Sequence, residues 1–210
     1  MNKTIIFDFT GIIADFNIAK LALDAPLKEK FSMLRIVVSL KKFKAIKSAF
    51  NKYQTGLIDR DEFKDVVASF YPNSAYVIPR LLDRLPSYVH VNQQVLDLAK
   101  ELKEQGYQLL IMSNSIPETE SVIKDLDLSM FDGVMLSCQM GIKKPSPEIF
   151  QYAIETYDLD PSSTLFIDDS DKNLKAAEKL GIQPIRCKNT EQVCETLKLL
   201  LSISDLEISK

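Results

Sequence analysis

Four groups of polar side chains in this 210-residue chain are suited to chemistry, and three of them directly follow a short apolar stretch. The groups are, in chain order, Asp8, then Ser113 with Asn114, then Lys144, and finally Asp168 with Asp169. Three carboxylates, a hydroxyl and an ammonium would make a poor hydrophobic core. Gathered at one place, they would instead suit a hard divalent cation and a phosphate group.

The apolar stretches have the length and composition of strands buried on both faces, as in a parallel sheet covered by helices. We expect strands at Thr4–Phe7, Tyr107–Met112, Gly133–Leu136, Thr164–Ile167 and Gln183–Arg186. Between and after them lie helical patterns, at Val91–Gln105, from Pro147 with Ser146 as N-cap, at Asp171–Leu180 and at Glu191–Leu201. This alternation predicts an α/β fold with a doubly wound parallel sheet. Because the carboxyl ends of parallel strands share one edge, the polar groups should converge there.

Residues 16–89 interrupt the alternation, because they contain no convincing strand and read as helices. The expected helices are Leu27–Tyr53, Asp59–Phe70 and Ser74–Asp83, and Asp59 followed by Glu62 resembles a capping box. We therefore divide the chain into a core of residues 1–15 and 90–210 and a helical domain of residues 16–89. Inserted after the first strand, the helical domain would lie over the carboxyl edge of the sheet, as a lid does.

The composition narrows the class of protein. A hydrophobic fraction of 46% provides a full core, and a net charge of -3 gives no basic field for nucleic acid. No apolar stretch approaches bilayer length, and Asp8 interrupts the first apolar run too early for a signal peptide. The three cysteines lack metal-type spacing. We expect a cytoplasmic protein, a monomer or homodimer, with neither nucleic acid nor membrane as a partner.

Taken together and in order, the motifs resemble those of the haloacid dehalogenase-like hydrolase superfamily. They are Phe7-Asp8-Phe9-Thr10-Gly11, Met112-Ser113-Asn114, Lys144-Pro145-Ser146-Pro147 and Phe166-Ile167-Asp168-Asp169. Nearly the whole chain is similar to the phosphatases of this superfamily that carry a small helical cap after the first motif. The resemblance implies a Rossmann-like core, a helical cap, phosphatase activity on a small phosphorylated metabolite, and Mg²⁺ as cofactor.

The resemblance also implies roles for individual residues. Asp8 would attack phosphorus and form an aspartyl-phosphate. Mg²⁺ would be held by Asp8, the backbone carbonyl of Thr10 and Asp169.

The remaining motif residues would support this centre. Lys144 would neutralise charge on Asp8 and the phosphoryl group, and Asp168 would orient Lys144 or a metal-bound water. Ser113, with backbone amides near Phe9, Thr10 and Asn114, would hold phosphoryl oxygens. Asn173 would orient the network without reacting.

Position 10 departs from the family pattern, in which such phosphatases have an aspartate two residues after the nucleophile. Thr10 cannot replace that general acid and base, which is typically worth about 10²–10⁴-fold. Three interpretations remain open: a slow phosphatase, a catalytically weak or inactive regulatory protein that binds phosphorylated ligands, and a substitution introduced to trap an intermediate. We favour the first.

Other features carry both a functional and a structural interpretation. Between Lys28 and Lys52 there are eight basic residues and one acid, Glu29, which could attract an anionic partner or could form a solvated helix face. His90, the only histidine, is more simply structural. Asp8 could merely begin a turn, and Asp168-Asp169 could cap a helix.

Overall fold

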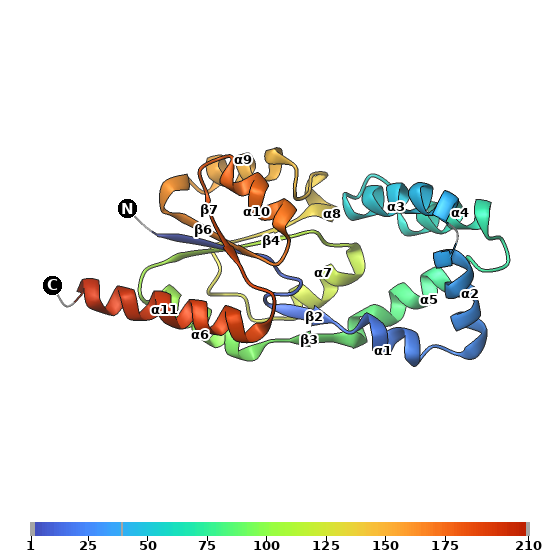
Figure 1. Ribbon diagram of the computed structural model, residues 1–210, viewed down its shortest axis with the longest axis horizontal. Helices are drawn as coiled ribbons and strands as arrows, with labels where there is room; N and C mark the ends of the chain where they lie inside the picture. The colour runs from blue at the N-terminus through green and yellow to red at the C-terminus, as the bar shows by residue number, and fades with distance from the viewer. Residues whose placement is uncertain (1–2, 39, 209–210) are drawn as a thin grey trace.

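A five-stranded parallel sheet forms the centre of the computed structural model, which describes residues 3–38 and 40–208 (Figure 1). Its strand order is β5-β4-β1-β6-β7, and every neighbouring pair is parallel. The strands are β1 (Thr4–Phe7), β4 (Gln108–Ser113), β5 (Gly133–Leu136), β6 (Thr164–Asp168) and β7 (Gln183–Arg186). The predicted doubly wound α/β fold is confirmed, and each predicted strand is present to within one residue.

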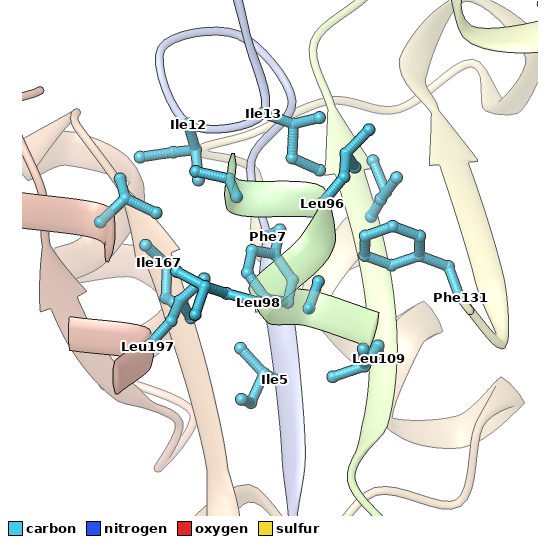
Figure 2. Close-up of a cluster of buried hydrophobic side chains, with 14 of the residues drawn as sticks. Ile5, Phe7, Ile12, Ile13, Leu96, Leu98, Leu109, Phe131, Ile167 and Leu197 are labelled. Atoms are coloured by element: carbon cyan, nitrogen blue, oxygen red, sulfur yellow. The ribbon is translucent and has the colours of Figure 1, made fainter. Parts of the chain in front are cut away.

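Helices cover both faces of the sheet, so the strands are buried on both sides (Figure 1). One face packs against α6 (Gln93–Glu104) and α11 (Thr190–Ile208), and the other against α9 (Pro147–Thr156) and α10 (Asp171–Glu178). Successive residues of β1 therefore enter different clusters. Figure 2 shows the first cluster, with Ile5 and Phe7 pointing into it, whereas Ile6 lies in the second.

Smaller elements connect these layers. They are α7 (Pro117–Lys124), α8 (Ser137–Met140) and the 3₁₀ turn η2 (Pro161–Ser163). Both α7 and α8 follow strands of the sheet directly, at the carboxyl edge where the polar motifs were expected. Among the described residues, no helix has the length and apolar character that crossing a membrane would require.

A helical insert, which we define as residues Ile18–Tyr88, extends from this edge away from the sheet (Figure 1). Its elements are α1 (Ile18–Leu23), α2 (Leu27–Val38), α3 (Leu40–Gln54), α4 (Arg60–Phe70), α5 (Val77–Arg84) and η1 (Leu85–Tyr88). The insert has a hydrophobic cluster of its own, which includes Tyr53, Phe63 and Val67. Ile116, from the loop that follows β4, joins this cluster from the core, and Phe16 packs against it.

Two short strands connect the insert to the core, and the sequence did not predict them. β2 (Ala14–Phe16) and β3 (Val89–Val91) pair antiparallel, so Phe16 and Val89 are strand residues although residues 16–89 were expected to contain no strand. Three residues are too few for a periodic pattern to be recognised. The sequence did not predict the helix α1 either, because this helix is also short.

The helices predicted to start at Val91 and Ser74 begin at Gln93 and Val77, since Val91 belongs to β3, and two further helix predictions require correction. The single helix expected at Leu27–Tyr53 is two helices, α2 and α3, and position 39 between them lies outside the described residues. Ser146 does precede α9, but its side-chain oxygen accepts no capping bond; its hydroxyl is turned toward the Glu148 carboxylate, to which it donates. The predicted capping box of Asp59 and Glu62 is confirmed.

Candidate active site

Asp8 follows β1 directly and is one of three groups in a buried ion-pair network. The Lys144 ammonium lies 2.8 Å from Asp8 Oδ1 and 2.9 Å from Asp168 Oδ2. Lys144 is 1% exposed and Asp168 is 0% exposed, so this charge is compensated by protein groups rather than by solvent. The lysine thus links the ends of β1 and β6, which are adjacent strands. The predicted convergence of these motifs at one sheet edge is present.

Both oxygens of Asp168 are already engaged by protein donors. Oδ1 accepts the Ser170 backbone N–H at 2.7 Å, and Oδ2 accepts the Lys144 ammonium at 2.9 Å. The Asn173 amide bridges the two oxygens, at 3.1 and 3.0 Å. A carboxylate held in this way has a fixed orientation, and it fixes the lysine in turn.

Three carboxylates lie close enough to share a cation. Ligand oxygens of Asp8, Asp168 and Asp169 all lie within 4.8 Å of one another, and Asp169 is exposed whereas the other two are buried. Gly11 comes very near this group, because a Cβ built on it would lie 3.3 Å from Asp169 Oδ2, and its φ of +87° also favours glycine. The loop after β1 therefore runs directly beside the acidic cluster.

The electrostatics of the cluster favour a cation. Burial raises the pKa of the Asp8 carboxyl to about 7. The neighbouring Lys144 ammonium acts to lower this pKa, and the Asp168 carboxylate acts to raise it. Burial, and then the Asp168 charge, also raise the pKa of Asp169. Three acids facing a single ammonium leave an excess of negative charge. Oxygen donors with such an excess are those that Mg²⁺ prefers, so the residues fit the expected cofactor.

The remaining predicted residues surround the cluster. Thr10 is exposed and pairs its backbone with Ala14, in the loop that contains Gly11. Ser113 is buried at the end of β4, the neighbour of β1. The side chain of Asn114 bonds the backbone of Lys144: Nδ2 donates to the Lys144 carbonyl at 2.8 Å, and the Lys144 N–H donates to Oδ1 at 2.9 Å. Its amide thus holds the lysine segment in place.

The structure adds contacts between the core and the helical insert that the sequence did not predict. The end of α3 lies against α8, and the Lys143 ammonium donates to Asn51 Oδ1 at 2.7 Å and to Gln54 Oε1 at 2.8 Å. The Ser137 hydroxyl donates to the Gln54 carbonyl at 2.6 Å. Lys143 is the residue before Lys144, so one dipeptide contacts both the insert and the acidic cluster.

A second contact joins the insert to the first turn of α7, the helix that comes after Ser113 and Asn114. The Tyr53 hydroxyl donates to the Glu118 carboxylate, at 2.7 and 2.6 Å from its two oxygens. Burial, and then this carboxylate, raise the pKa of Tyr53, so the hydroxyl stays protonated and remains a donor. The sequence offered no signal for this pair, because its members are 65 positions apart.

Comparison with known proteins agrees with this geometry. A family model described as haloacid dehalogenase-like hydrolase matches residues 2–181. A D-ribitol-5-phosphate phosphatase from Bacteroides thetaiotaomicron is 28% identical over 96% of this chain and 100% of its own length. The acyl-CoA dehydrogenase family member 10 of Mus musculus is 37% identical over 48% of this chain, which spans only 10% of that longer protein.

Solved structures show the same fold. A haloacid dehalogenase-family enzyme from Bacteroides thetaiotaomicron, crystallised with magnesium and inorganic phosphate, superimposes with a TM-score of 0.70 at 26% identity, covering 89% of this chain and 94% of that one. The family match is consistent with the order of the motifs, with the parallel sheet and with the acidic cluster. The chain belongs to the haloacid dehalogenase-like hydrolases, a family of enzymes.

Proposed function

We propose that this protein is a magnesium-dependent phosphatase that hydrolyses a small phosphorylated metabolite through an aspartyl-phosphate on Asp8. The observation that carries the proposal is the buried Asp8–Lys144–Asp168 network with Asp169 beside it, since three carboxylates and one ammonium at a sheet edge suit a cation and a phosphate. A relative that this chain matches over the relative's full length is a D-ribitol-5-phosphate phosphatase. An enzyme of similar structure was crystallised with magnesium and inorganic phosphate.

In the proposed first step, an Asp8 oxygen forms a bond to phosphorus while the bond from phosphorus to the leaving oxygen breaks, and that oxygen takes a proton from solvent water. Water then attacks the phosphorus of the aspartyl-phosphate, which releases inorganic phosphate and restores Asp8. Lys144 favours the ionised form of Asp8 and orients it, and Ser113 with the backbone amide of Asn114 holds phosphoryl oxygens. A magnesium ion held by Asp8, the Thr10 carbonyl and Asp169 would neutralise the charge of the phosphate.

We propose in addition that turnover is slow, because a threonine at position 10 offers no carboxyl to protonate the leaving oxygen or to activate water. Substrates with good leaving groups, such as acyl or anomeric phosphates, depend least on that proton. We retain the division into a core of residues 1–15 and 90–210 and a cap of residues 16–89. We also retain a cytoplasmic monomer or homodimer as part of the proposal.

Phosphate release from a panel of sugar phosphates, acyl phosphates and D-ribitol 5-phosphate tests the proposal. We expect release that requires Mg²⁺, ceases with a chelator and is lost in Asp8→Asn, since an amide neither attacks phosphorus nor binds the cation well. Release by Asp8→Asn at the wild-type rate would refute the nucleophile.

A catalytically weak protein that binds phosphorylated ligands is the second candidate, and Thr10 is the observation that favours it. Thr10→Asp separates the two, because it restores the missing acid and base. We expect turnover to rise at least tenfold, with little change in the affinity for inorganic phosphate. An unchanged turnover, with phosphate still bound in the presence of Mg²⁺, would favour the binding protein.

A further inference from the structure

The outer face of α2 exposes a row of large apolar side chains. Leu27, Phe31 and Leu34 are 69%, 60% and 57% exposed. Their spacing of four and three residues places them on one face of the helix. We call these three residues the α2 apolar row. Single exposed apolar residues are common, but an aligned row of three is the kind of surface that marks a contact with another molecule.

Basic side chains flank the row on both sides. At about 100° per residue, Lys30 falls on one side of the row and Lys28 and Arg35 on the other. All three are exposed. A narrow apolar strip between two basic edges is the pattern of a helix that lies in the interface between water and an anionic membrane.

The only acid in α2 does not offset these charges. Glu29 is 4% exposed, and its carboxylate is paired with Arg80 at 3.2 Å and Arg84 at 2.6 Å, both from α5. The exposed face therefore keeps its positive charge in a chain whose net charge is -3. The rest of the molecule is acidic, so the basic charge is concentrated on this part of the insert.

We propose that the outer face of α2 docks on the surface of an anionic lipid bilayer. The apolar row enters the headgroup region, and Lys28, Lys30 and Arg35 contact the anionic headgroups. The helix lies at the end of the molecule away from the sheet, where a flat surface can reach it (Figure 1). This contact requires no spanning segment, and it revises the expectation of no membrane partner, which rested on the absence of a long apolar stretch.

The charges distinguish a bilayer from a second copy of the chain. A symmetric dimer through this face would place the basic edges of two copies near each other, and like charges at close range oppose association. A ridge of protruding side chains also requires a matching groove on a protein partner, whereas a lipid surface adapts to it. The inference does not depend on the proposed phosphatase activity.

Flotation with lipid vesicles tests the proposal on the full chain. Vesicles of phosphatidylcholine alone are compared with vesicles that also contain phosphatidylserine, at low and high salt. We expect binding to the anionic vesicles only, weakened by salt. The double variants Lys30→Glu/Arg35→Glu and Phe31→Ser/Leu34→Ser should each reduce the bound fraction at least about tenfold at limiting lipid.

Leu57→Ser is the matched control, since Leu57 is 68% exposed on the same insert but lies outside the row. It should bind vesicles as the wild type does. Circular dichroism and thermal unfolding establish that each variant is folded. Equal binding to both kinds of vesicle, or binding that the two double variants do not reduce, would overturn the proposal. Dimerisation in light scattering that Phe31→Ser/Leu34→Ser abolishes, without any vesicle binding, would also overturn it.

Discussion

The core and the helical insert are held together by different kinds of contact. In the core, one buried ammonium joins two buried carboxylates, and every member of that network has several partners. The insert meets the core through polar contacts at the end of α3, through the packing of η1 against α7, and through the side chains of Ile116 and Phe16. The proposed reacting groups therefore lie in the core, and the insert contacts the elements that follow the strands carrying them. Two adjacent lysines contact the two regions separately: Lys144 belongs to the buried network of the core, and Lys143 bonds the insert.

Lys144→Met should give the largest effect. It removes the positive charge beside Asp8 and leaves Asp168 without its ion pair, which should lower kcat by at least about 10²–10³-fold and destabilise the fold by about 3–5 kcal/mol. Steady-state kinetics and urea unfolding measure the two effects. A variant that retains wild-type kcat would show that the core network is not catalytic.

Tyr53→Phe tests how firmly the insert is held. Losing a hydrogen bond to a charged, half-buried acceptor should reduce the free energy of unfolding by about 1.5–3 kcal/mol. Tyr152→Phe is the control, since Tyr152 is 43% exposed on α9 and should change stability by less than about 0.5 kcal/mol. Equal urea midpoints for the two variants would mean that Tyr53 and Glu118 contribute nothing to holding the insert.

The pH dependence of the free energy of unfolding, measured on metal-free protein, tests the raised pKa of Asp8. Its pKa is raised from 3.8 to about 7 on folding, so between these values the unfolded chain releases a proton that the folded chain keeps. The contribution of Asp8 to the free energy of unfolding is thus full below pH 4 and is lost as the pH rises through 7, at up to about 1.4 kcal/mol per pH unit.

Subtracting the pH profile of Asp8→Asn from that of the wild type, both from chemical unfolding in a chelator, should reveal this slope. A cation bound by the carboxylates should remove this slope in the wild type, because the positive charge of the metal stabilises the ionised form of Asp8. A difference profile that is flat between pH 4 and 7 would contradict the raised pKa of Asp8.

Lys143→Met should give the smallest effect and thereby sharpen the comparison. The variant loses two hydrogen bonds to the insert and none to the acidic cluster, so KM should rise less than about tenfold while kcat stays nearly constant. Lys143→Arg, which keeps the charge and the donors, should restore KM. A fall in kcat as large as that of Lys144→Met would mean that the insert directly controls the catalytic groups.

Sequence reasoning succeeded where the signal is local. The strand β1 is a continuous apolar stretch with Asp8 at its end, and β6 with Asp168 has the same form. Once these strands are known to be parallel, their ends must meet, so the acidic cluster follows from local patterns and one rule of topology. The capping box at Asp59 was predictable for the same reason, because all its atoms lie within four residues.

Contacts between distant positions that belong to no recognisable motif could not be predicted from the sequence. Lys143 and Asn51 are 92 positions apart, and nothing in either neighbourhood specifies the other. The partner of the Asn114 side chain was also beyond the sequence, since a side-chain amide after a strand can bond a ligand or a backbone equally well, and here it bonds the backbone of Lys144. Such partners are decided by how the insert packs on the sheet edge.

The strand pair that carries the insert has a consequence for how such a molecule can diversify. Ala14 and Val91 are paired residues, so the chain leaves the core and returns to it at one place. Replacing everything between these two positions would alter the two junctions, the polar contacts at the end of α3 and the packing of the insert on Ile116 and α7. A new set of substrates could therefore be acquired by exchanging one module, with the reacting groups left undisturbed.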